Sequence, residues 1–264
     1  MMIEYQLSQR FPVLKLFTTT RRGGVSKGNY ATFNPSPFSG DKQDDVAENL
    51  NLLSTKLNIA PENVIFPYQM HQTGVRKIDA GFMKSTESER AGFLYGIDAL
   101  VTDLPGICIG VTTADCVPVF FYDDVRKVAA VAHAGWRGTC AGIVAETIRV
   151  MQADYGCIPN NIYAVIGPSV SVNAYQVGEE LYSAFLGKGF PVASIFTRNA
   201  EGLFLDLWKA NEYLLLQCGI TAGHIEIAGR CTYTEHDLFF SARRLGVKSG
   251  RMLSGMMIPY PANI

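Results

Sequence analysis

The chain has 264 residues, of which 48% are hydrophobic and 18% charged, proportions typical of a soluble globular protein with one or two domains. Its 23 basic and 24 acidic side chains give a net charge of −1, so no overall positive field favours nucleic acid or an anionic membrane surface. A cupredoxin-type multicopper oxidase needs roughly ten imidazoles, and this chain has four histidines. We therefore expect at most one metal site.

The N-terminus has none of the features of a targeting segment. Residues 1–17 carry a charge or a proline every few positions, and no apolar run has the length of a signal peptide or of a membrane span. The six cysteines lack the density of a disulfide-bonded secreted scaffold, so we expect free thiols and a cytoplasmic location. Because no linker or repeat interrupts the chain, residues 1–264 are expected to form a single domain.

The first third of the chain predicts a loop, a helix and two strands. Residues 18–37 are polar and glycine-bearing, which indicates a long surface loop placed to lie over a site. Residues 43–58 carry acids in the first turn and apolar residues at helical spacing, and therefore predict a helix. The apolar residues between positions 64 and 79 predict two short strands flanking His71.

The rest of the chain mixes strands and helices. Apolar, β-branched runs between positions 96 and 138 predict three or four buried strands, and residues 138–156 predict a helix directly after a Gly-Trp-Arg-Gly turn. Later patterns predict a strand, a helix, a long amphipathic helix and a strand, at residues 161–170, 177–187, 204–219 and 224–231. Because strict βαβ order is absent, we expect an α+β sandwich of sheets covered by helices.

Three side chains that bind soft metals stand at or beside predicted strand ends: His71, Cys116 and His133. Cys116 and His133 belong to successive strands joined by one tight turn, so the fold can bring them together. A thiolate with two neutral imidazoles is a familiar zinc set, and three protein ligands leave a fourth position for water or substrate, as in catalytic sites. The structural alternative is a small buried cysteine with two hydrogen-bonded histidines.

Further candidate residues surround these three. Gly-Trp-Arg-Gly after His133 permits a close backbone approach and a helix N-terminus suited to an anion, where Arg137 adds a bidentate contact or forms a surface ion pair. Asp115, next to Cys116, is either a general acid or base or the cap of a turn. The loop 21–26 either supplies further anion donors or is a solvated turn.

Taken together, the segments TRRGGVSKGNY, QMHQTG, TTADCVPVFFYD, VAHAGWRGT and CTYTEHDLFFSARR resemble the YfiH-type family, also called the laccase-domain or polyphenol-oxidase family. The resemblance covers nearly the whole chain in order. It implies an α-β-β-α layered sandwich with mixed sheets, and a zinc ion on His71, Cys116 and His133. We expect catalytic roles for Cys116, His133, Asp115 and Arg137, and substrate contacts at Arg21, Gly24, Ser26, Gln69 and Arg137. His224 and His236 are not expected to be ligands.

The resemblance also implies a function. Bacterial members of the family are described as enzymes that phosphorolyse adenosine, inosine and 5′-methylthioadenosine and deaminate adenosine; others are linked to peptidoglycan-precursor editing or copper-dependent phenol oxidation. We therefore expect a zinc-dependent purine nucleoside phosphorylase with accessory adenosine deaminase activity, whose partners are purine nucleosides and phosphate. Copper in place of zinc, a precursor-editing amidase, a metal-free Cys116/His133 hydrolase, a phenol oxidase and a non-catalytic zinc-stabilised interaction module stay open.

Overall fold

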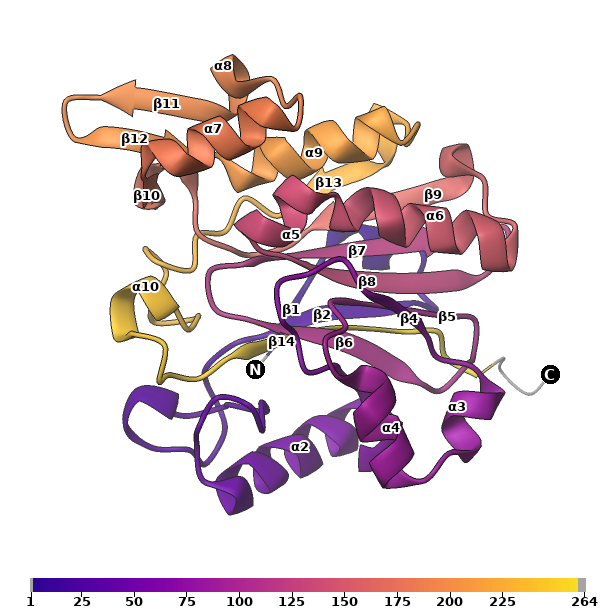
Figure 1. Cartoon of the computed structure of the whole chain (residues 1–264). Coiled ribbons are helices and arrows are strands. Elements are labelled where there is room, and N and C mark those ends of the chain that lie inside the picture. Colours follow the sequence, from indigo (N-terminus) through magenta and orange to yellow (C-terminus); the bar gives the residue numbers. More distant parts are fainter. Residues whose placement is uncertain (1, 261–264) are drawn as a thin grey trace.

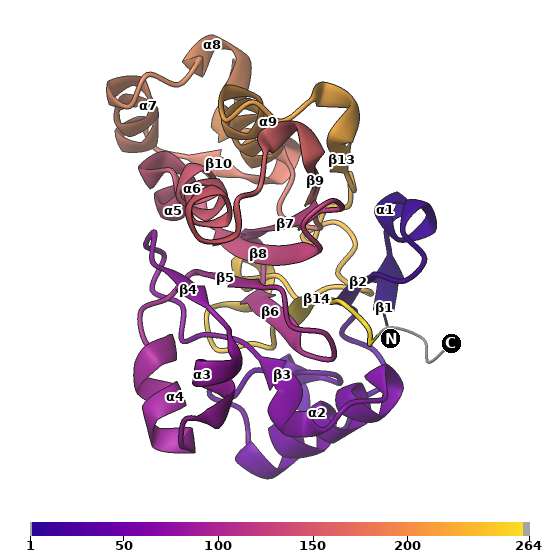
Figure 2. The ribbon, with the colours of Figure 1, turned by 90° about the vertical axis from the view of Figure 1, so that its right-hand side faces the viewer.

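Two β-sheets lie face to face in the middle of the molecule, and helices cover the outer face of each (Figures 1 and 2). The computed structural model describes residues 2–260. The longer strands of both sheets are buried over almost their whole length, as the apolar, β-branched runs between positions 96 and 138 predict for the central strands. The α+β class and the α-β-β-α layering with mixed sheets are therefore confirmed.

One sheet has six strands in the order β13-β9-β7-β8-β5-β4. Its two outer pairs, β13 with β9 and β4 with β5, are parallel, and the inner pairs are antiparallel. The strands are β4 Val75–Lys77, β5 Ala99–Thr102, β7 Val117–Asp123, β8 Val128–Ala134, β9 Ile162–Ile166 and β13 Ile225–Ile227.

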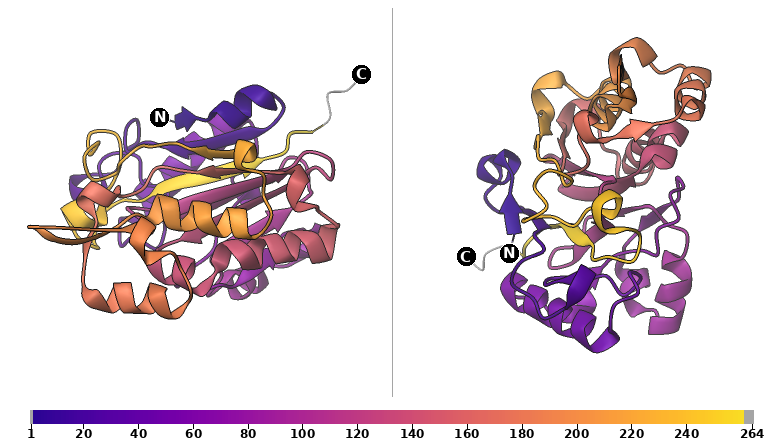
Figure 3. Two further views of the ribbon diagram at one scale, coloured as in Figure 1. Left: turned by 90° about the horizontal axis from the view of Figure 1, so that it is seen from above. Right: turned by 90° about the vertical axis from the view of Figure 1, so that its left-hand side faces the viewer.

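The second sheet has five strands in the order β1-β2-β14-β6-β3, and a small third sheet has the order β10-β12-β11. The hairpin of this third sheet projects from the body of the molecule (Figure 3, left). The strands are β1 Met2–Glu4, β2 Lys15–Thr19, β3 Val64–Ile65, β6 Cys108–Thr113, β14 Met252–Met257, β10 Gln176–Val177, β11 Phe196–Asn199 and β12 Gly202–Leu205.

The helices form two outer layers. Over the six-stranded sheet lie α5 Trp136–Ala141, α6 Ile143–Tyr155, α7 Glu179–Gly187, α8 Val192–Ile195 and α9 Leu207–Gln217. On the opposite side lie α2 Gln43–Leu57, α3 Ala80–Lys84 and α4 Glu87–Leu94. Two short helices stand outside these layers, α1 Gln6–Arg10 and α10 Ala242–Leu245, and single 3₁₀ turns occur at Gly28–Tyr30, Pro61–Asn63, Pro159–Asn161, Val172–Ala174 and Ala222–His224. No helix within residues 2–260 has the length and apolar composition to cross a bilayer.

Strand β7 shows why its sequence is apolar without a break. Phe121 packs in the core beneath α6 and α9, whereas its neighbours Phe120 and Tyr122 pack in the core between the sheets. Successive side chains of a strand point to opposite faces, so a strand between two cores needs apolar residues at every position. The six cysteines are unpaired; Cys157 lies in the core beneath α6 and α9, and Cys108 lies in a separate core against Leu53 and Leu57 of α2.

Most predicted elements are present, with two corrections. The helix after His133 does not follow a Gly-Trp-Arg-Gly turn, because it begins at Trp136 and is divided at Gly142, whose φ of 89° places it in the left-handed region. The long amphipathic helix begins at Leu207 rather than at residue 204, because Asp206 accepts a hydrogen bond from the Lys209 N–H and caps it.

The predicted loop after β2 meets the C-terminal part of the chain on one edge of the sandwich. The Arg21 N–H donates to the Leu238 carbonyl, and the Gly250 N–H donates to the Asn29 carbonyl. Helix α10 lies on the same edge, between the two helix layers (Figure 3, right). These two segments cover the edge at which β7 begins and β8 ends.

Candidate metal centre

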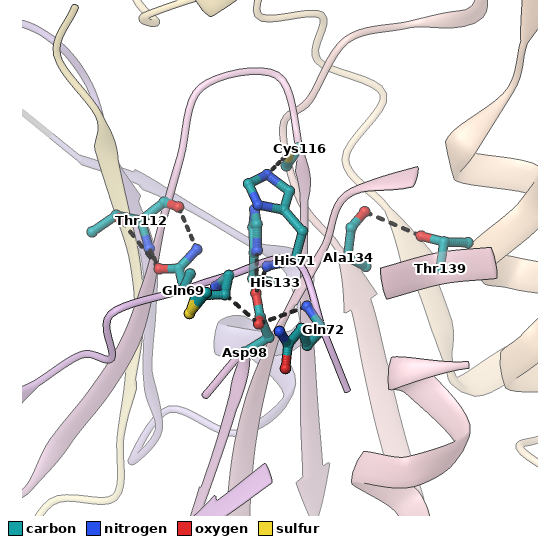
Figure 4. A network of polar contacts seen from close by, with 10 residues as sticks. Gln69, His71, Gln72, Asp98, Thr112, Cys116, His133, Ala134 and Thr139 are labelled. Carbon is teal, nitrogen blue, oxygen red and sulfur yellow. Dashed lines mark hydrogen bonds and ion pairs between the residues drawn. The ribbon is translucent and has the colours of Figure 1, made fainter. Parts of the chain in front are cut away.

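The three predicted metal ligands meet beside the first residues of β7 (Figure 4). Cys116 immediately precedes β7, and His133 lies near the end of β8, because the antiparallel register pairs His133 with Pro118. His71 comes from the loop between β3 and β4. The ligand atoms of all three lie within 4.8 Å of one another, with Cys116 Sγ 3.9 Å from His71 Nε2.

This donor set fits a zinc ion. Tetrahedral zinc would hold one sulfur and two nitrogens about 3.3–3.6 Å apart, which small side-chain rotations can reach from the observed spacing. Within residues 2–260, the group comprises these three side chains and leaves a coordination position for water or substrate. Gly135 permits the assembly, because a Cβ atom there would lie 2.9 Å from Cys116 Sγ and 3.1 Å from His71 Cδ2.

A buried carboxylate that the sequence analysis missed organises the ligands. Asp98, fully buried at the start of β5, accepts hydrogen bonds from His133 Nδ1 at 2.8 Å and from the His71 N–H at 3.0 Å on one oxygen. Its other oxygen accepts from the N–H groups of Met70 and Gln72, at 3.1 and 2.8 Å. One carboxylate therefore fixes both the His71 loop and the His133 ring (Figure 4).

The contact with Asp98 also sets the chemistry of His133. When Nδ1 donates to the carboxylate, the lone pair of Nε2 is directed away from Asp98, which is the tautomer that a metal needs. The sequence did carry a signal: Asp98 is a charged residue within the apolar run 96–102, and a buried carboxylate needs several hydrogen-bond partners.

Without metal, Cys116 and His133 form an ion pair. Burial opposes the thiolate, but the charge and hydrogen bond of His133 and the contact with His71 outweigh it and lower the pKa of Cys116 to about 6. Burial also opposes the imidazolium, but Cys116 and Asp98 outweigh it and raise the pKa of His133 to about 9. Near neutral pH the site therefore holds a thiolate beside a protonated imidazole.

Metal binding should displace the proton on His133. Between about pH 7 and 8.5 we expect about one proton to be released per zinc ion, and the affinity to rise about tenfold per pH unit, because His133 is protonated below its raised pKa. Titration calorimetry in buffers of different ionisation enthalpy measures the released protons, with His236→Asn as the control histidine variant. A binding enthalpy that does not depend on the buffer would contradict the ion pair.

The ligands open into a cavity of about 310 Å³. Phe38 and Tyr68 stand on its wall with 49% and 42% of their surfaces exposed, and their rings meet edge to face at 4.9 Å. Gln69 also lines the cavity; its amide pairs with the backbone of Thr112, with Oε1 accepting at 2.7 Å and Nε2 donating at 2.9 Å. The cavity therefore combines a metal-binding group with exposed aromatic rings.

Asp115 holds a turn. One carboxylate oxygen accepts from Thr232 Oγ1 and the other from the Arg243 N–H, both at 2.7 Å, and its backbone φ is 88°. Both oxygens are thus occupied by contacts that join the Cys116 turn to Thr232 and to α10. This arrangement matches the turn-capping alternative.

The sequence analysis expected Arg21, Gly24 and Ser26 to contact substrate. None of the three lines the cavity. Arg21 donates to the carbonyls of Ala31 and His236, and a Cβ on Gly24 would lie 2.2 Å from the Asn49 side-chain oxygen. Ser26 is buried and accepts a hydrogen bond from the same amide. These three residues hold the loop in shape, and Ser36 and Phe38 are the loop positions that reach the cavity.

Arg137 is exposed in the first turn of α5, where its guanidinium stacks 4.3 Å from the Trp136 ring, and it does not line the cavity. The other histidines lie outside the ligand group, as expected. His224 stacks on Tyr163 at 3.9 Å, and the carbonyl of His236 accepts from Arg21. Cys231 accepts hydrogen bonds from the N–H and hydroxyl of Ser171.

A family model described as multi-copper polyphenol oxidoreductase laccase matches residues 15–259. The chain belongs to this laccase-domain family. Among residues 2–260, however, this member offers one group of three metal-binding side chains, whereas a multicopper cluster needs several such groups.

Its relatives in the laccase-domain family have nucleoside-related names. A purine nucleoside phosphorylase from Bacteroides thetaiotaomicron is 44% identical, with 97% of this chain and 96% of that protein covered. Adenosine deaminase RL5, from an unknown prokaryotic organism, is 37% identical over 92% and 93% of the two chains. The crystal structure of the hypothetical protein YfiH from Bacillus licheniformis superimposes with a TM-score of 0.90 at 31% identity, over 97% and 96% of the chains.

Proposed function

We propose that the protein is a zinc-dependent purine nucleoside phosphorylase, acting on adenosine, inosine and 5′-methylthioadenosine, with accessory adenosine deaminase activity. One observation carries the proposal: the three metal ligands open into a cavity whose wall exposes Phe38 and Tyr68, on which a planar base can stack. The names of the relatives, purine nucleoside phosphorylase and adenosine deaminase, support it.

The residues of the site would have different roles in the proposed reactions. When bound to His71, Cys116 and His133, zinc supplies a Lewis acid for an oxygen at the open coordination position. Asp98 keeps His133 in the ligand tautomer. In phosphorolysis a phosphate oxygen bonds to C1′ of the ribose while the bond from C1′ to the purine nitrogen breaks; the electron pair leaves with the purine, which takes up a proton from solvent. In deamination, water replaces the amino group of adenine, which leaves as ammonia.

One alternative has an observation in its favour. The lowered pKa of Cys116 and the adjacent His133 also suit a metal-free cysteine hydrolase, in which the thiolate is the nucleophile. Such an enzyme would lose nothing to a chelator, whereas the zinc enzyme would become inactive. The unpaired cysteines support a cytoplasmic setting for either activity.

The test combines metal analysis with product chromatography. Purified protein should contain about one zinc ion per chain and should release adenine and hypoxanthine from adenosine and inosine only when phosphate is added, with ribose 1-phosphate as the second product. Conversion of adenosine to inosine without phosphate would demonstrate the deaminase. Zinc without nucleoside turnover would contradict the proposal, and full activity of metal-free protein would favour the cysteine hydrolase.

A further inference from the structure

Arg251 is a cation on the wall of the metal cavity that the sequence analysis did not single out. It stands just before β14 and is partly buried. Among residues 2–260, no carboxylate oxygen lies within 4.0 Å of its nitrogens. A guanidinium that is withdrawn from water usually has an anionic partner, so its position beside a cavity points to an anion that the protein must bind from solution.

The neutral groups around Arg251 position the guanidinium without neutralising it. Nη1 donates to the carbonyls of Ser249 and Gly250, at 2.8 and 3.0 Å, and Nη2 donates to the carbonyl of Val247 at 2.9 Å. The Arg251 backbone N–H donates to Asn34 Oδ1 at 3.0 Å. The segment 247–250 therefore holds the guanidinium, Asn34 fixes the backbone of Arg251, and none of these partners is charged.

A metal ion on the three ligands would add positive charge to the cavity, as Arg251 does. A divalent ion on one thiolate and two neutral imidazoles leaves a net charge of +1, and Arg251 adds a second positive charge to the same cavity. Arg251 lines the same cavity as the three metal ligands. Burial lowers the pKa of Arg251, and the negative charges of Cys116 and Asp115 oppose this shift without reversing it. A metal-loaded cavity of this kind attracts an anion, and a guanidinium fork suits a tetrahedral oxyanion.

We propose that Arg251 is the anion-binding residue of this cavity and that its ligand is a tetrahedral oxyanion, inorganic phosphate in the proposed phosphorolysis. The assignment rests on the proposed function for the identity of the anion. It gives Arg251 the part that the sequence suggested for Arg137, which stacks on Trp136 and does not line the cavity.

The experiment compares Arg251→Gln and Arg251→Lys with Arg149→Gln, a control on the exposed face of α6 whose partner is Glu146. For zinc-loaded protein, we expect Arg251→Gln to weaken binding of inorganic phosphate in calorimetry and to raise the KM for phosphate, each by about 10- to 100-fold. The KM for inosine should change by less than about threefold, because the base contacts other residues. Arg251→Lys keeps the charge without the fork and should fall between Gln and wild type.

The outcomes separate the two proposals. If the wild type phosphorolyses inosine and Arg251→Gln leaves phosphate binding and its KM unchanged, the assignment of Arg251 is wrong and the function stands. If the wild type binds phosphate through Arg251 but does not turn over nucleosides, the function fails and the anion site stands. Equal rises in both KM values would show that Arg251 only holds the loop. AMP tests the other source of a phosphate group. If Arg251→Gln loses AMP binding while its KM for inorganic phosphate is unchanged, Arg251 recognises the phosphate of a nucleotide, and inorganic phosphate is overturned as its ligand.

Discussion

Replacing Cys116 by alanine in the proposed zinc enzyme should remove the metal and lower the turnover of adenosine and inosine by at least about 1000-fold. The substitution leaves two imidazoles, and two neutral ligands no longer offset the charge of the ion. Loss of a Lewis acid worth several kcal/mol to the transition state corresponds to a rate effect of this size. Metal content by elemental analysis and turnover by product chromatography should fall together.

Two further variants show whether Cys116 acts as a ligand or as a nucleophile. Cys218→Ala removes another partly buried thiol, at the end of α9, and should leave zinc content and turnover unchanged. Cys116→Asp keeps an anionic ligand but removes the thiolate, so a zinc enzyme should retain metal and part of its activity. If Cys116→Asp binds zinc and is as inactive as Cys116→Ala, Cys116 is the nucleophile and the proposed mechanism is wrong.

The group of His71, Cys116 and His133 could be predicted largely from residue type and from the position of each residue near a strand end. Histidine and cysteine are the residue types that bind zinc, and an antiparallel pair of strands joined by a tight turn brings Cys116 and His133 together through register alone. His71 was less constrained, because its loop is placed by tertiary contacts. The sequence offered it as a histidine beside a predicted strand end, and the resemblance to the family implied it as a ligand.

The surroundings of the triad could not be predicted in the same way, because they depend on contacts between distant segments. Arg251 reaches the cavity from the position just before the last strand, and Asn34 in the first loop bonds its backbone N–H. Arg21 and Arg137 looked equally suitable in the sequence, yet neither lines the cavity, whereas Arg251 does. Residue type indicated that anion-binding arginines were available, and only the fold distinguished between them.

Asp98→Asn should lower zinc affinity by about 10- to 100-fold and also destabilise the metal-free protein. The carboxylate accepts four hydrogen bonds, and the amide nitrogen of asparagine, being a donor, cannot replace the oxygen that it substitutes. Two donors therefore lose their acceptor in a site that water does not reach, which costs about 2–6 kcal/mol of the free energy of unfolding. Zinc titration against a competing chelator and denaturant unfolding of metal-free protein measure the two effects.

Asp123→Asn is the matched control, because Asp123 is also a fully buried carboxylate in the six-stranded sheet. It lies at the far end of β7, opposite Val128, and accepts from the backbone of the following turn. This variant tests the loss of a buried carboxylate away from the metal group, so its zinc affinity should equal that of the wild type. A loss of zinc affinity only in Asp98→Asn would show that Asp98 positions the ligands; unchanged zinc affinity in Asp98→Asn would mean that His71 and His133 are oriented without it.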